Sequence, residues 1–513
     1  MLSALIQQLL AAQAREHPDQ VALIWQGEET TYAALHTRVL ALASRLAGSG
    51  RVGERVGILA WNCPEFVDFI YAVPACGQIL VPLNARLAPA ELLYQLQAAG
   101  VSTLFGDSQL LQALQQALLQ TRGAGHEVTV IDLQVDYESW LSGGPVAPLP
   151  DTQATDPVWI LYTSGSTGRP KGAILTHDSF MAGLESAAIG RPVLPGDRYL
   201  YPFPLFHVAA HNVLLQHQYG AAVILTRSFD AAATLKACRE MGVTTLSLAP
   251  TMIAMLLDHP EFSPDDLRAV RTIGYGASAM PETLLQRLLA ETEIGLCQSY
   301  GMTELSGSAA FLTVDDHRLA ADARPELLQS VGRPLPTVEI RLVNEQGQGC
   351  ATGQCGEILV KARQCMRGYW NQPEATAQAI VNGWLHTGDI GRFDANGYLY
   401  IVDRKKDMIV SGGENVASRE VEEVIRRHKA IKDCAVIGLP DARWGEAVCG
   451  VVKVAGAVTD RELTAHCRQS LASYKTPKRW LRVENLPLNA AGKVDKPALR
   501  STFSEPDAGQ VPA

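Results

Sequence analysis

Two rhythms of apolar and polar residues alternate along most of the chain. Between about Val21 and Asp389, short β-branched or apolar runs alternate with stretches that have helical spacing. This alternation is typical of βαβ units and parallel sheets, so it predicts a large N-terminal α/β domain. The expected strands are Glu54–Leu59, Ile79–Pro82, Val128–Leu133, Val158–Tyr162, Ala221–Leu225 and Thr244–Leu248, and a helix is expected over Pro64–Val73.

The pattern changes after about Gly332. Short alternating strands, separated by the turns 344–347 and 394–397, predict a β-rich subdomain over about 332–404. A charged run, Asp403–Asp407, then precedes a double glycine and a helix expected over Arg419–Arg427. We therefore predict an N-terminal domain over residues 1–404, a small mobile α+β C-terminal domain over 405–500, and a disordered tail over 501–513.

Composition excludes several classes of protein. The chain has 513 residues, 47% of them hydrophobic and 19% charged, which is typical of a soluble globular protein and not of a disordered one. Its formal net charge of −9 argues against a nucleic-acid binder, which needs a positive face to neutralise phosphates.

Two apolar segments raise the question of membrane insertion. The stretch Tyr199–Thr226 has no charged residue, but prolines, histidines and amides interrupt it, so we expect a buried strand and helix. Leu2, Leu5, Ile6 and Leu9 recur at helical spacing, which predicts an amphipathic helix and not a signal peptide. The ten cysteines include no C-x-x-C pair, so we expect reduced thiols in a cytoplasmic protein, without disulfides or a structural metal.

The strongest chemical signal is the sequence YTSGSTGRPKG over 162–172, which follows an expected strand. Small and hydroxyl residues let backbone N–H groups and side-chain hydroxyls converge on an anion, and Lys171 adds positive charge. Pro170 stands where a Walker A loop needs glycine. The alternative is a flexible surface turn. The proline and lysine that follow the small residues favour the phosphate-binding loop over this alternative. The predicted phosphate-binding residues are Thr163, Ser164, Gly165, Ser166, Thr167, Gly168 and Lys171.

This motif resembles the phosphate loop of the adenylate-forming superfamily, which contains acyl-CoA synthetases, adenylation domains of non-ribosomal peptide synthesis and beetle luciferase. Further motifs similar to those of the superfamily follow in order: GYGAS at 274–278, YGMTE at 300–304, TGD at 387–389, Arg404 with Lys406, GGEN at 412–415, and Gly492-Lys493. Together they span about Val21 to Arg500, and in type they are closest to fatty-acid or aryl-acid CoA ligases.

The resemblance implies a nucleotide site assembled from distant segments. A carboxylate such as Asp389 can accept both ribose hydroxyls, Tyr300 offers a flat face to a purine, and Glu304 can hold Mg²⁺ through oxygen. A core tyrosine, an Asx-turn aspartate and a solvated arginine are the structural alternatives. The implied cofactor-binding residues are Gly276, Ala277, Ser278, Ser299, Tyr300, Gly301, Met302, Thr303, Asp389, Val402, Arg404 and Lys493, together with the phosphate loop.

The resemblance also implies catalytic roles. Lys493 corresponds to the lysine that enters the site during adenylation, where an ammonium can stabilise the charge that develops on the α-phosphate. Lys406 corresponds to a hinge position about which the small domain rotates. Thr163 and Glu304 complete the implied catalytic set with His207, which borders the acyl pocket in acyl-CoA synthetases. A buried structural histidine is an equally good interpretation of His207.

The segment Tyr199–Thr226 has no acidic side chain, which constrains the acid that a member of this superfamily would activate. Amino-acid-activating relatives place an aspartate near this segment to hold the substrate ammonium, and no acidic side chain is present here. An uncompensated ammonium in an apolar pocket would be costly, so we expect a non-amino carboxylic acid. Residues expected near its apolar part are His207, Gly276, Met302 and Leu305.

The acceptor is expected to be a separate thiol, since no carrier-protein segment follows Arg500, and free coenzyme A is the simplest choice. The segments Gly438–Asp441 and Trp444–Glu446 resemble those at the coenzyme A tunnel. The basic residues Lys475, Lys478 and Arg479 could meet its phosphates or form a solvated face.

Two departures from the family pattern concern the C-terminal region. Ala417-Ser418 stands where many relatives have an aromatic residue followed by proline, and Leu488 and Ala491 replace a common basic residue and a threonine. These changes leave Lys493 in place and bear on the geometry of thioester formation.

The sequence therefore predicts an ATP-dependent carboxylic acid–CoA ligase that forms an acyl-adenylate and releases pyrophosphate and AMP. The expected substrate is an apolar fatty, aryl or alicyclic acid, and ATP, Mg²⁺ and coenzyme A are the expected cofactor set. Alternatives are a ligase that loads a separate carrier protein, a luciferase-like oxygenase, and a non-catalytic acyl- or nucleotide-binding relative. We expect small-molecule partners, no nucleic acid and no transmembrane segment, and a homodimer stays open.

Overall fold

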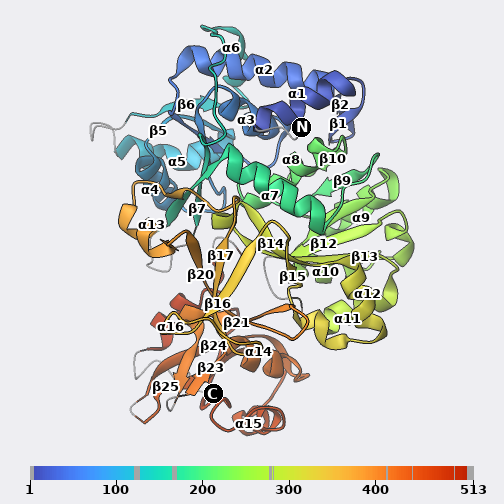
Figure 1. The fold of residues 1–513 in the computed structure, drawn as a ribbon, viewed down its shortest axis with the longest axis vertical. Coiled ribbons are helices and arrows are strands. Elements are labelled where there is room, and N and C mark those ends of the chain that lie inside the picture. Colours follow the sequence, from blue (N-terminus) through green and yellow to red (C-terminus); the bar gives the residue numbers. More distant parts are fainter. Residues whose placement is uncertain are drawn as a thin grey trace. The chain divides into compact units, whose positions relative to one another are not determined.

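The computed structural model describes residues 5–120, 127–163, 170–276, 280, 282–411, 414–441, 443–489 and 492–504. Its contacts divide the chain into two compact units. The first unit is Met1–Ile340 with Val360–His386, and the second unit is Arg341–Leu359 with Thr387–Ala513. Figure 1 shows the elements of both units, coloured along the sequence.

The first unit contains a seven-stranded sheet with the order β18-β8-β7-β4-β3-β5-β6. Its strands are β3 (Arg55–Leu59), β4 (Ile79–Pro82), β5 (Val101–Gly106), β6 (Thr129–Asp132), β7 (Pro157–Thr163), β8 (Lys171–Thr176) and β18 (Gly368–Tyr369). The pairs among β3 to β7 are parallel, whereas β8 runs antiparallel to both β7 and β18. All four residues of β4 are buried, as expected for a parallel strand that is covered on both faces.

A nine-stranded sheet of the first unit has the order β15-β14-β13-β12-β11-β9-β10-β1-β2. Its strands are β1 (Val21–Trp25), β2 (Glu28–Thr31), β9 (Arg198–Tyr201), β10 (Ala222–Leu225), β11 (Thr245–Leu248), β12 (Thr272–Gly276), β13 (Gly295–Met302), β14 (Gly307–Leu312) and β15 (Arg333–Pro334). The central pairs are parallel, namely β1–β10, β10–β9, β9–β11, β11–β12 and β12–β13. The pairs toward the two edges are antiparallel, namely β1–β2, β13–β14 and β14–β15.

Helices connect and cover these two sheets. They are α1 (Ile6–Glu16), α2 (Tyr32–Ser49), α3 (Pro64–Ala75), α4 (Pro89–Ala99), α5 (Ser108–Gln120), α6 (Tyr137–Ser142), α7 (His177–Gly190), α8 (His211–Gln218), α9 (Ala231–Glu240), α10 (Pro250–Leu257), α11 (Glu282–Glu291), α12 (Val314–Asp322) and α13 (Pro373–Ala379). Thr176 caps α7, since its hydroxyl accepts a hydrogen bond from Ser179 N–H at 3.1 Å. Helix α7 directly follows β8 and contacts β14, so it links the two sheets.

A third sheet has the order β16-β17-β20-β19, with β21 paired to β20. Its strands are β16 (Glu339–Val343), β17 (Gly356–Lys361), β19 (Ile380–Val381), β20 (Trp384–Phe393) and β21 (Leu399–Arg404). The tight turn between β20 and β21 closes with a hydrogen bond from Gly397 N–H to Asp394 O, and Gly397 has a φ of +79°. This positive φ favours glycine at the turn.

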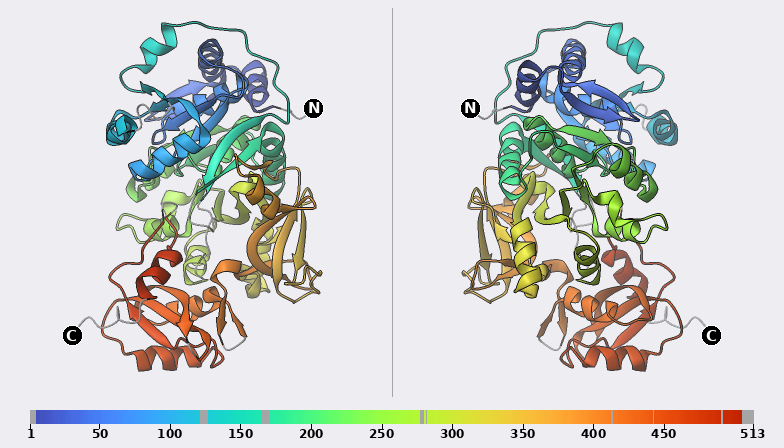
Figure 2. Two further views of the ribbon diagram at one scale, coloured as in Figure 1. Left: turned by 90° about the vertical axis from the view of Figure 1, so that its left-hand side faces the viewer. Right: turned by 90° about the vertical axis from the view of Figure 1, so that its right-hand side faces the viewer.

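The second unit also contains a sheet with the order β23-β22-β25-β24, with β26 paired to β25. Its strands are β22 (Ile409–Ser411), β23 (Glu414–Val416), β24 (Ile431–Asp441), β25 (Gly445–Val454) and β26 (Arg479–Arg482), and its helices are α14 (Ser418–Arg426), α15 (Asp460–Arg468) and α16 (Lys496–Phe503). Alternate residues of β24 point to opposite faces: Cys434 and Val436 pack with residues of α14 and α15, and Ala435 and Ile437 with Leu499 of α16. Both faces of this sheet are therefore buried, with helices on each (Figures 1 and 2).

The predicted fold class is confirmed, because parallel-rich sheets fill the first unit and an α+β fold follows it. The predicted strands and helices appear within a few residues of their expected bounds, and Tyr199–Thr226 contains part of β9, then α8 and β10. The predicted tail over 501–513 needs a correction, because α16 continues to Phe503; residues 505–513 lie outside the described part. The boundary predicted at 404 and the mobility of the small domain stay predictions.

In the described part of the chain, no helix has the length and apolar character needed to cross a membrane.

Candidate active site

Two residues of the predicted phosphate-binding motif lie on adjacent strands, one on each side of the central residues of the motif. Thr163 ends β7 and Lys171 begins β8, and the two are paired across the antiparallel ladder. Both residues are half-buried. The predicted loop residues between them, Ser164, Gly165, Ser166, Thr167 and Gly168, lie outside the described residues. The structure therefore defines the base of the loop, where one hydroxyl and one ammonium are available.

Glu304 lies beside this base, in a short 3₁₀ turn that follows β13. The residue is 6% exposed, and its Oε1 accepts a hydrogen bond from the Thr163 hydroxyl at 3.4 Å. The same oxygen accepts a bond from the Tyr369 hydroxyl at 3.0 Å. Segments that are far apart in the sequence therefore converge on one carboxylate, and the catalytic roles of Thr163 and Glu304 stay predictions.

Tyr369 is a site residue that the sequence analysis missed. It lies on β18, which pairs with β8, and its ring centre is 5.2 Å from Lys171 Nζ. Burial raises the pKa of the Tyr369 phenol and the Glu304 carboxylate raises it further, so this hydroxyl stays a proton donor to Glu304. No local pattern marks Tyr369, because its importance comes from a strand pairing between distant segments.

The donor set at Glu304 fits Mg²⁺. Its Oε2 receives no hydrogen bond from any residue that the structure describes, and carboxylate oxygen is the ligand type that Mg²⁺ prefers. Within the described residues, no cluster of three or more His, Cys, Asp or Glu side chains could hold a metal. Mg²⁺ commonly uses one or two carboxylates together with water and substrate phosphates, which agrees with a single protein carboxylate.

The parallel strands β12 and β13 end next to each other. Gly276, the last residue of β12, is paired with Ser299 of β13, and a Cβ atom on Gly276 would lie 2.7 Å from the Ser299 carbonyl oxygen. A side chain on Gly301 would likewise collide with the carbonyl oxygen of Gly307. Glycine is therefore required at both positions by close backbone approach.

The other predicted residues of this region follow the same strands. Tyr300 and Met302 lie on β13 and Thr303 begins the 3₁₀ turn, all of them half-buried. Ala277 and Ser278 lie outside the described residues. Because ligands of open α/β sheets bind beyond the carboxyl ends of parallel strands, this position suits the predicted nucleotide and acyl contacts, which stay predictions.

His207 is half-buried and directly precedes the 3₁₀ turn Val208–Ala210. Its ring centre lies 4.8 Å from that of Phe206. The nearby His211 is buried, its Nδ1 lies 2.8 Å from Val208 O, and burial lowers its pKa. A Cβ atom on Gly307 would lie 3.5 Å from the His211 ring, so this ring packs against Gly307. The structure thus gives His211 a structural position, and the acyl-pocket role of His207 stays a prediction.

In the second unit, Asp389 and Arg404 form an ion pair. They are cross-strand partners on β20 and β21, and Arg404 Nε lies 2.7 Å from Asp389 Oδ1. The Asp389 side chain is 4% exposed, whereas that of Arg404 is 46% exposed. Asp389 is thus a strand residue paired with a cation, which argues against the Asx-turn alternative. Val402, also predicted at the nucleotide, lies on β21.

The T-G-D motif holds Asp389 in place through its own hydrogen bonds. The Thr387 hydroxyl donates to Ile358 O at 2.8 Å and accepts from Asp389 N–H at 3.1 Å. Gly388 has a φ of +70°, a conformation that favours glycine. Each residue of the motif therefore has a distinct structural task.

Lys493 lies three residues before Lys496, the first residue of α16. Its N–H donates to Asn489 Oδ1 at 3.1 Å, and its carbonyl accepts from Asn489 N–H at 2.7 Å. Desolvation of the ammonium lowers the pKa of Lys493, as does the charge of Arg404, whereas Asp389 raises it. Asp389 and Arg404 therefore act electrostatically on Lys493, and the role of Lys493 in adenylation stays a prediction.

The remaining C-terminal candidates have mixed outcomes. Lys406 is exposed in the 3₁₀ turn Lys405–Asp407, and Gly412, Gly413 and Ala491 lie outside the described residues. Lys475 Nζ lies 2.7 Å from both carboxylate oxygens of Glu420, so it is already paired with an acid. Lys478 and Arg479 keep their alternative interpretations.

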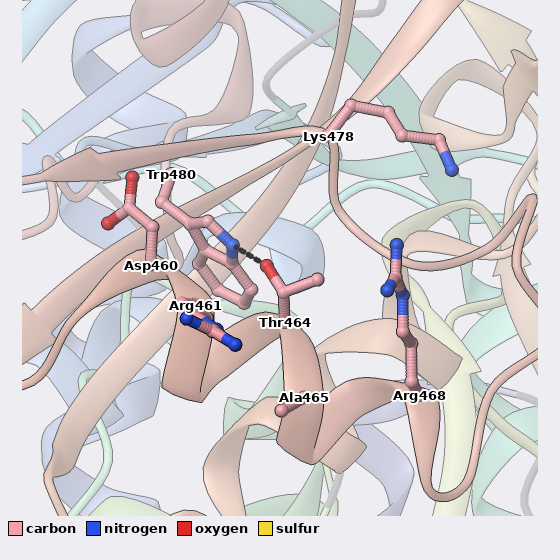
Figure 3. A pocket seen from close by; sticks show the side chains of 7 residues that line it. All are labelled: Asp460, Arg461, Thr464, Ala465, Arg468, Lys478 and Trp480. Atoms are coloured by element: carbon pink, nitrogen blue, oxygen red, sulfur yellow. Dashed lines mark hydrogen bonds between the residues drawn. The ribbon is translucent and has the colours of Figure 1, made fainter.

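A pocket of about 320 Å³ lies in the second unit, and Figure 3 shows the residues that line it. It is formed by α15 with Lys478 and Trp480, and Trp480 Nε1 donates to the Thr464 hydroxyl at 2.9 Å. Burial and the charge of Arg468 lower the pKa of Lys478, and Figure 3 shows both cationic groups at one side of the pocket. Of the predicted residues that the structure describes, only Lys478 lines this pocket.

Comparison with known proteins assigns the family. The family described as "AMP-binding enzyme" matches residues 10–370, and "AMP-binding enzyme C-terminal domain" matches residues 420–493. The chain is 36% identical over 498 residues to a feruloyl-CoA synthase of Amycolatopsis sp, covering 96% of this chain and 97% of that protein. It is 32% identical over 500 residues to a fatty acid–[acyl-carrier-protein] ligase of Streptomyces coeruleorubidus, covering 96% and 95%.

Solved structures agree with this assignment. The o-succinylbenzoate CoA synthetase from Bacillus subtilis, in complex with its acyl-adenylate intermediate, has a TM-score of 0.86 at 30% identity and covers 98% of this chain and 99% of that one. The same synthetase in complex with ATP and magnesium ion has a TM-score of 0.85 at 30% identity, covering 97% and 99%.

The chain therefore belongs to the AMP-binding enzyme family. The predicted class of enzyme, an AMP-forming acid–thiol ligase, is confirmed.

Proposed function

We propose that this protein joins an aromatic or similarly apolar carboxylic acid to coenzyme A through an acyl-adenylate. The observation that carries the proposal is the ion pair between the buried Asp389 carboxylate and Arg404, which both act electrostatically on Lys493. A carboxylate suits ribose hydroxyls, and the cations suit phosphate and the charge that develops during its transfer. ATP, Mg²⁺ and coenzyme A are the cofactor set that follows.

The proposed chemistry has two steps. A carboxylate oxygen of the acid attacks the α-phosphorus of ATP, an acyl C–O–P linkage forms, and pyrophosphate leaves as the α–β bond breaks. The thiol of coenzyme A then attacks the acyl carbon, AMP leaves, and the thiol proton passes to solvent. Lys493 stabilises the charge of the first step, and Asp389 orients the ribose.

The groups around Glu304 are proposed to serve the phosphates of ATP. Glu304 would hold Mg²⁺, with Thr163 and Tyr369 orienting its carboxylate through Oε1. Mg²⁺, when bound, neutralises phosphate charge. Lys171 adds a second positive charge at the base of the loop. Gly276, Ser299, Tyr300, Gly301 and Met302, at the ends of β12 and β13, are proposed to contact the adenine and the acyl group.

An aromatic acid is supported by the relatives, whose names specify feruloyl-CoA and o-succinylbenzoate. The segment Tyr199–Thr226 agrees with an apolar acid, since it has no acidic side chain to hold a substrate ammonium. The ligase of Streptomyces coeruleorubidus that acts on a fatty acid and an acyl-carrier protein keeps a second candidate in view, namely a fatty acid delivered to a carrier. A cytoplasmic location stays a prediction of the sequence, and the oligomeric state stays open.

A substrate panel tests the proposal. Purified protein is incubated with MgATP and one acid at a time, from acetate through long-chain, benzoate-like, cinnamate-like and steroid acids, and acid-dependent pyrophosphate release is measured. Coenzyme A and an acyl-carrier protein are then compared as acceptors by mass analysis of the thioester. We expect turnover with an aryl acid and coenzyme A. If no acid in the panel gave pyrophosphate release, adenylate formation would be contradicted. If the thioester formed on the carrier protein alone, the carrier would replace coenzyme A as the acceptor.

A further inference from the structure

A buried polar network joins three elements of the second unit. Asp403, near the end of β21, is 6% exposed, and its Oδ2 accepts hydrogen bonds from Ser418 N–H at 2.5 Å and from the Ser418 hydroxyl at 2.7 Å. Its Oδ1 accepts from Arg404 N–H at 2.7 Å. Ser418 is fully buried at the first position of α14. One carboxylate thus fixes the backbone of the nucleotide-side residue Arg404 and the start of a helix.

The network continues to Lys496, the first residue of α16. Lys496 Nζ donates to the Ser418 hydroxyl at 2.6 Å and lies 2.8 Å from Glu422 Oε1. Glu422 is buried on α14 and also accepts from Val436 N–H at 2.9 Å. Lys496 therefore lies between two buried acidic side chains, which need a counter-charge in this environment.

The ends of the network lie next to two residues of the proposed site. Asp403 directly precedes Arg404, and Lys496, the first residue of α16, follows Lys493 by three residues. Lys493 is hydrogen-bonded to Asn489 through its N–H and its carbonyl, and Asp495 N–H donates to Pro487 O at 2.8 Å. A displacement of the start of α16 would therefore move Lys493 as well.

We propose that Asp403, Ser418 and Lys496 are positioning residues that hold Lys493 beside Arg404 and Asp389 for adenylate formation. The inference rests on the proposed function of Lys493. Its physical basis is that an ammonium stabilises a transition state only when it is already in place, and an error of about 1 Å can cost about 100-fold in rate.

Ser418 supplies both hydrogen bonds that Asp403 Oδ2 accepts, one through its N–H and one through its hydroxyl. A proline at this position would have neither the N–H nor the hydroxyl that Asp403 uses. The backbone would accept proline, because position 418 is the first of the helix and Ala417 before it has an extended conformation, with φ −72° and ψ 117°. Ser418→Pro therefore removes both hydrogen bonds to Asp403 and the one from Lys496 with little strain, which makes it a sharp test.

The experiment compares two half-reactions in the full-length protein. Adenylate formation is measured by acid-dependent exchange of pyrophosphate into ATP, and thioester formation by supplying a preformed acyl-adenylate with coenzyme A. The variants are Ser418→Pro, Ser418→Ala, Lys496→Met and the conservative Lys496→Arg, with the exposed Lys432→Met on β24 as the matched control. Thermal unfolding of each variant is recorded alongside.

We expect Ser418→Pro and Lys496→Met to lower kcat of adenylate formation about tenfold or more, with KM for ATP within about twofold. Ser418→Ala should have a smaller effect, Lys496→Arg should restore most of the rate, and Lys432→Met should match the parent. Thioester formation from the supplied adenylate should stay near the parent rate in every folded variant.

Parent-like adenylate formation in Ser418→Pro and Lys496→Met would overturn the inference. An equal loss in both half-reactions would also overturn it, because it would indicate general damage to the fold. Should Lys496→Met fail to fold, Ser418→Ala and Lys496→Arg still decide the question by their graded rates. Absence of exchange in the parent with every acid would instead contradict the proposed function, so the two failures are distinguishable.

Discussion

Asp389 and Arg404 face each other across β20 and β21, with 2.7 Å between Oδ1 and Nε, and the acid is far more buried than the base. The guanidinium therefore fixes one oxygen of a carboxylate that is otherwise enclosed by protein. An ion pair in which one partner is half exposed contributes little net stability, so we assign its main value to orientation. This arrangement leads to the first prediction.

Asp389→Asn should raise KM for ATP about tenfold, because an amide can accept from the ribose through one oxygen only and loses the charge that Arg404 orients. The measurement is the ATP dependence of pyrophosphate release at a saturating acid concentration. Asp460→Asn, at an exposed aspartate that begins α15, is the control and should leave this KM unchanged. An unchanged KM in Asp389→Asn would remove the ribose assignment.

Lys493→Ala should lower kcat of adenylate formation about 10²- to 10³-fold, since removal of one preorganised group at the developing charge has this size of effect. KM for ATP and for the acid should change little, because the interaction belongs mainly to the transition state. Single-turnover formation of the adenylate is the measurement, with the exposed Lys429→Ala as control. Equal rates in the variant and the parent would refute the role.

Glu304→Gln should shift the Mg²⁺ dependence of activity to a concentration at least tenfold higher, because a neutral amide is a weaker ligand for a hard cation. Tyr369→Phe removes one hydrogen bond to the same carboxylate, so its shift should be smaller and in the same direction. The measurement is activity during a Mg²⁺ titration after treatment with a chelator. Identical titration curves for the parent and Glu304→Gln would place the metal elsewhere.

The first unit should lose stability in mild acid because of its buried histidines. His217 Nδ1 lies 2.8 Å from the Tyr71 hydroxyl and Nε2 lies 2.9 Å from Ala22 O, and burial lowers the pKa of His217 to about 4. Between its ordinary pKa near 6.5 and about 4, the unfolded chain binds a proton that the folded chain does not, so stability falls as the pH decreases.

This loss is worth up to about 1.4 kcal/mol per pH unit for one such histidine. His217→Gln keeps a donor and an acceptor but does not titrate, so its stability should depend less on pH than that of the parent. Urea unfolding at pH 7 and pH 4.5 should give a parent-minus-variant difference of about 2–3 kcal/mol. His177 and His317 are also buried histidines with lowered pKa values, and they are unchanged in both proteins. The same pH dependence in parent and variant would therefore contradict the burial argument for His217.

The local elements of this protein are predictable from its sequence, because periodicity and turn residues act over a few positions. The run Ile79–Pro82 has the same bounds as β4, and Pro64 begins α3 as a proline at the first helical position should. The motif order in the chain likewise predicted the family, since each motif is a short segment with its own backbone requirement. The phosphate-binding role of residues 164–168 stays a prediction, because these residues lie outside the described part of the chain.

Tertiary structure decided the pairings between distant segments. Tyr369 reaches Glu304 because β18 pairs with β8, and Lys475 is held by Glu420 although it had been a candidate for phosphate contact. Lys496 reaches Ser418 across 78 positions of the sequence. The hydrophobic pattern determines which face of an element is buried, whereas the partner of a polar side chain depends on strand order and register, which only the folded chain defines.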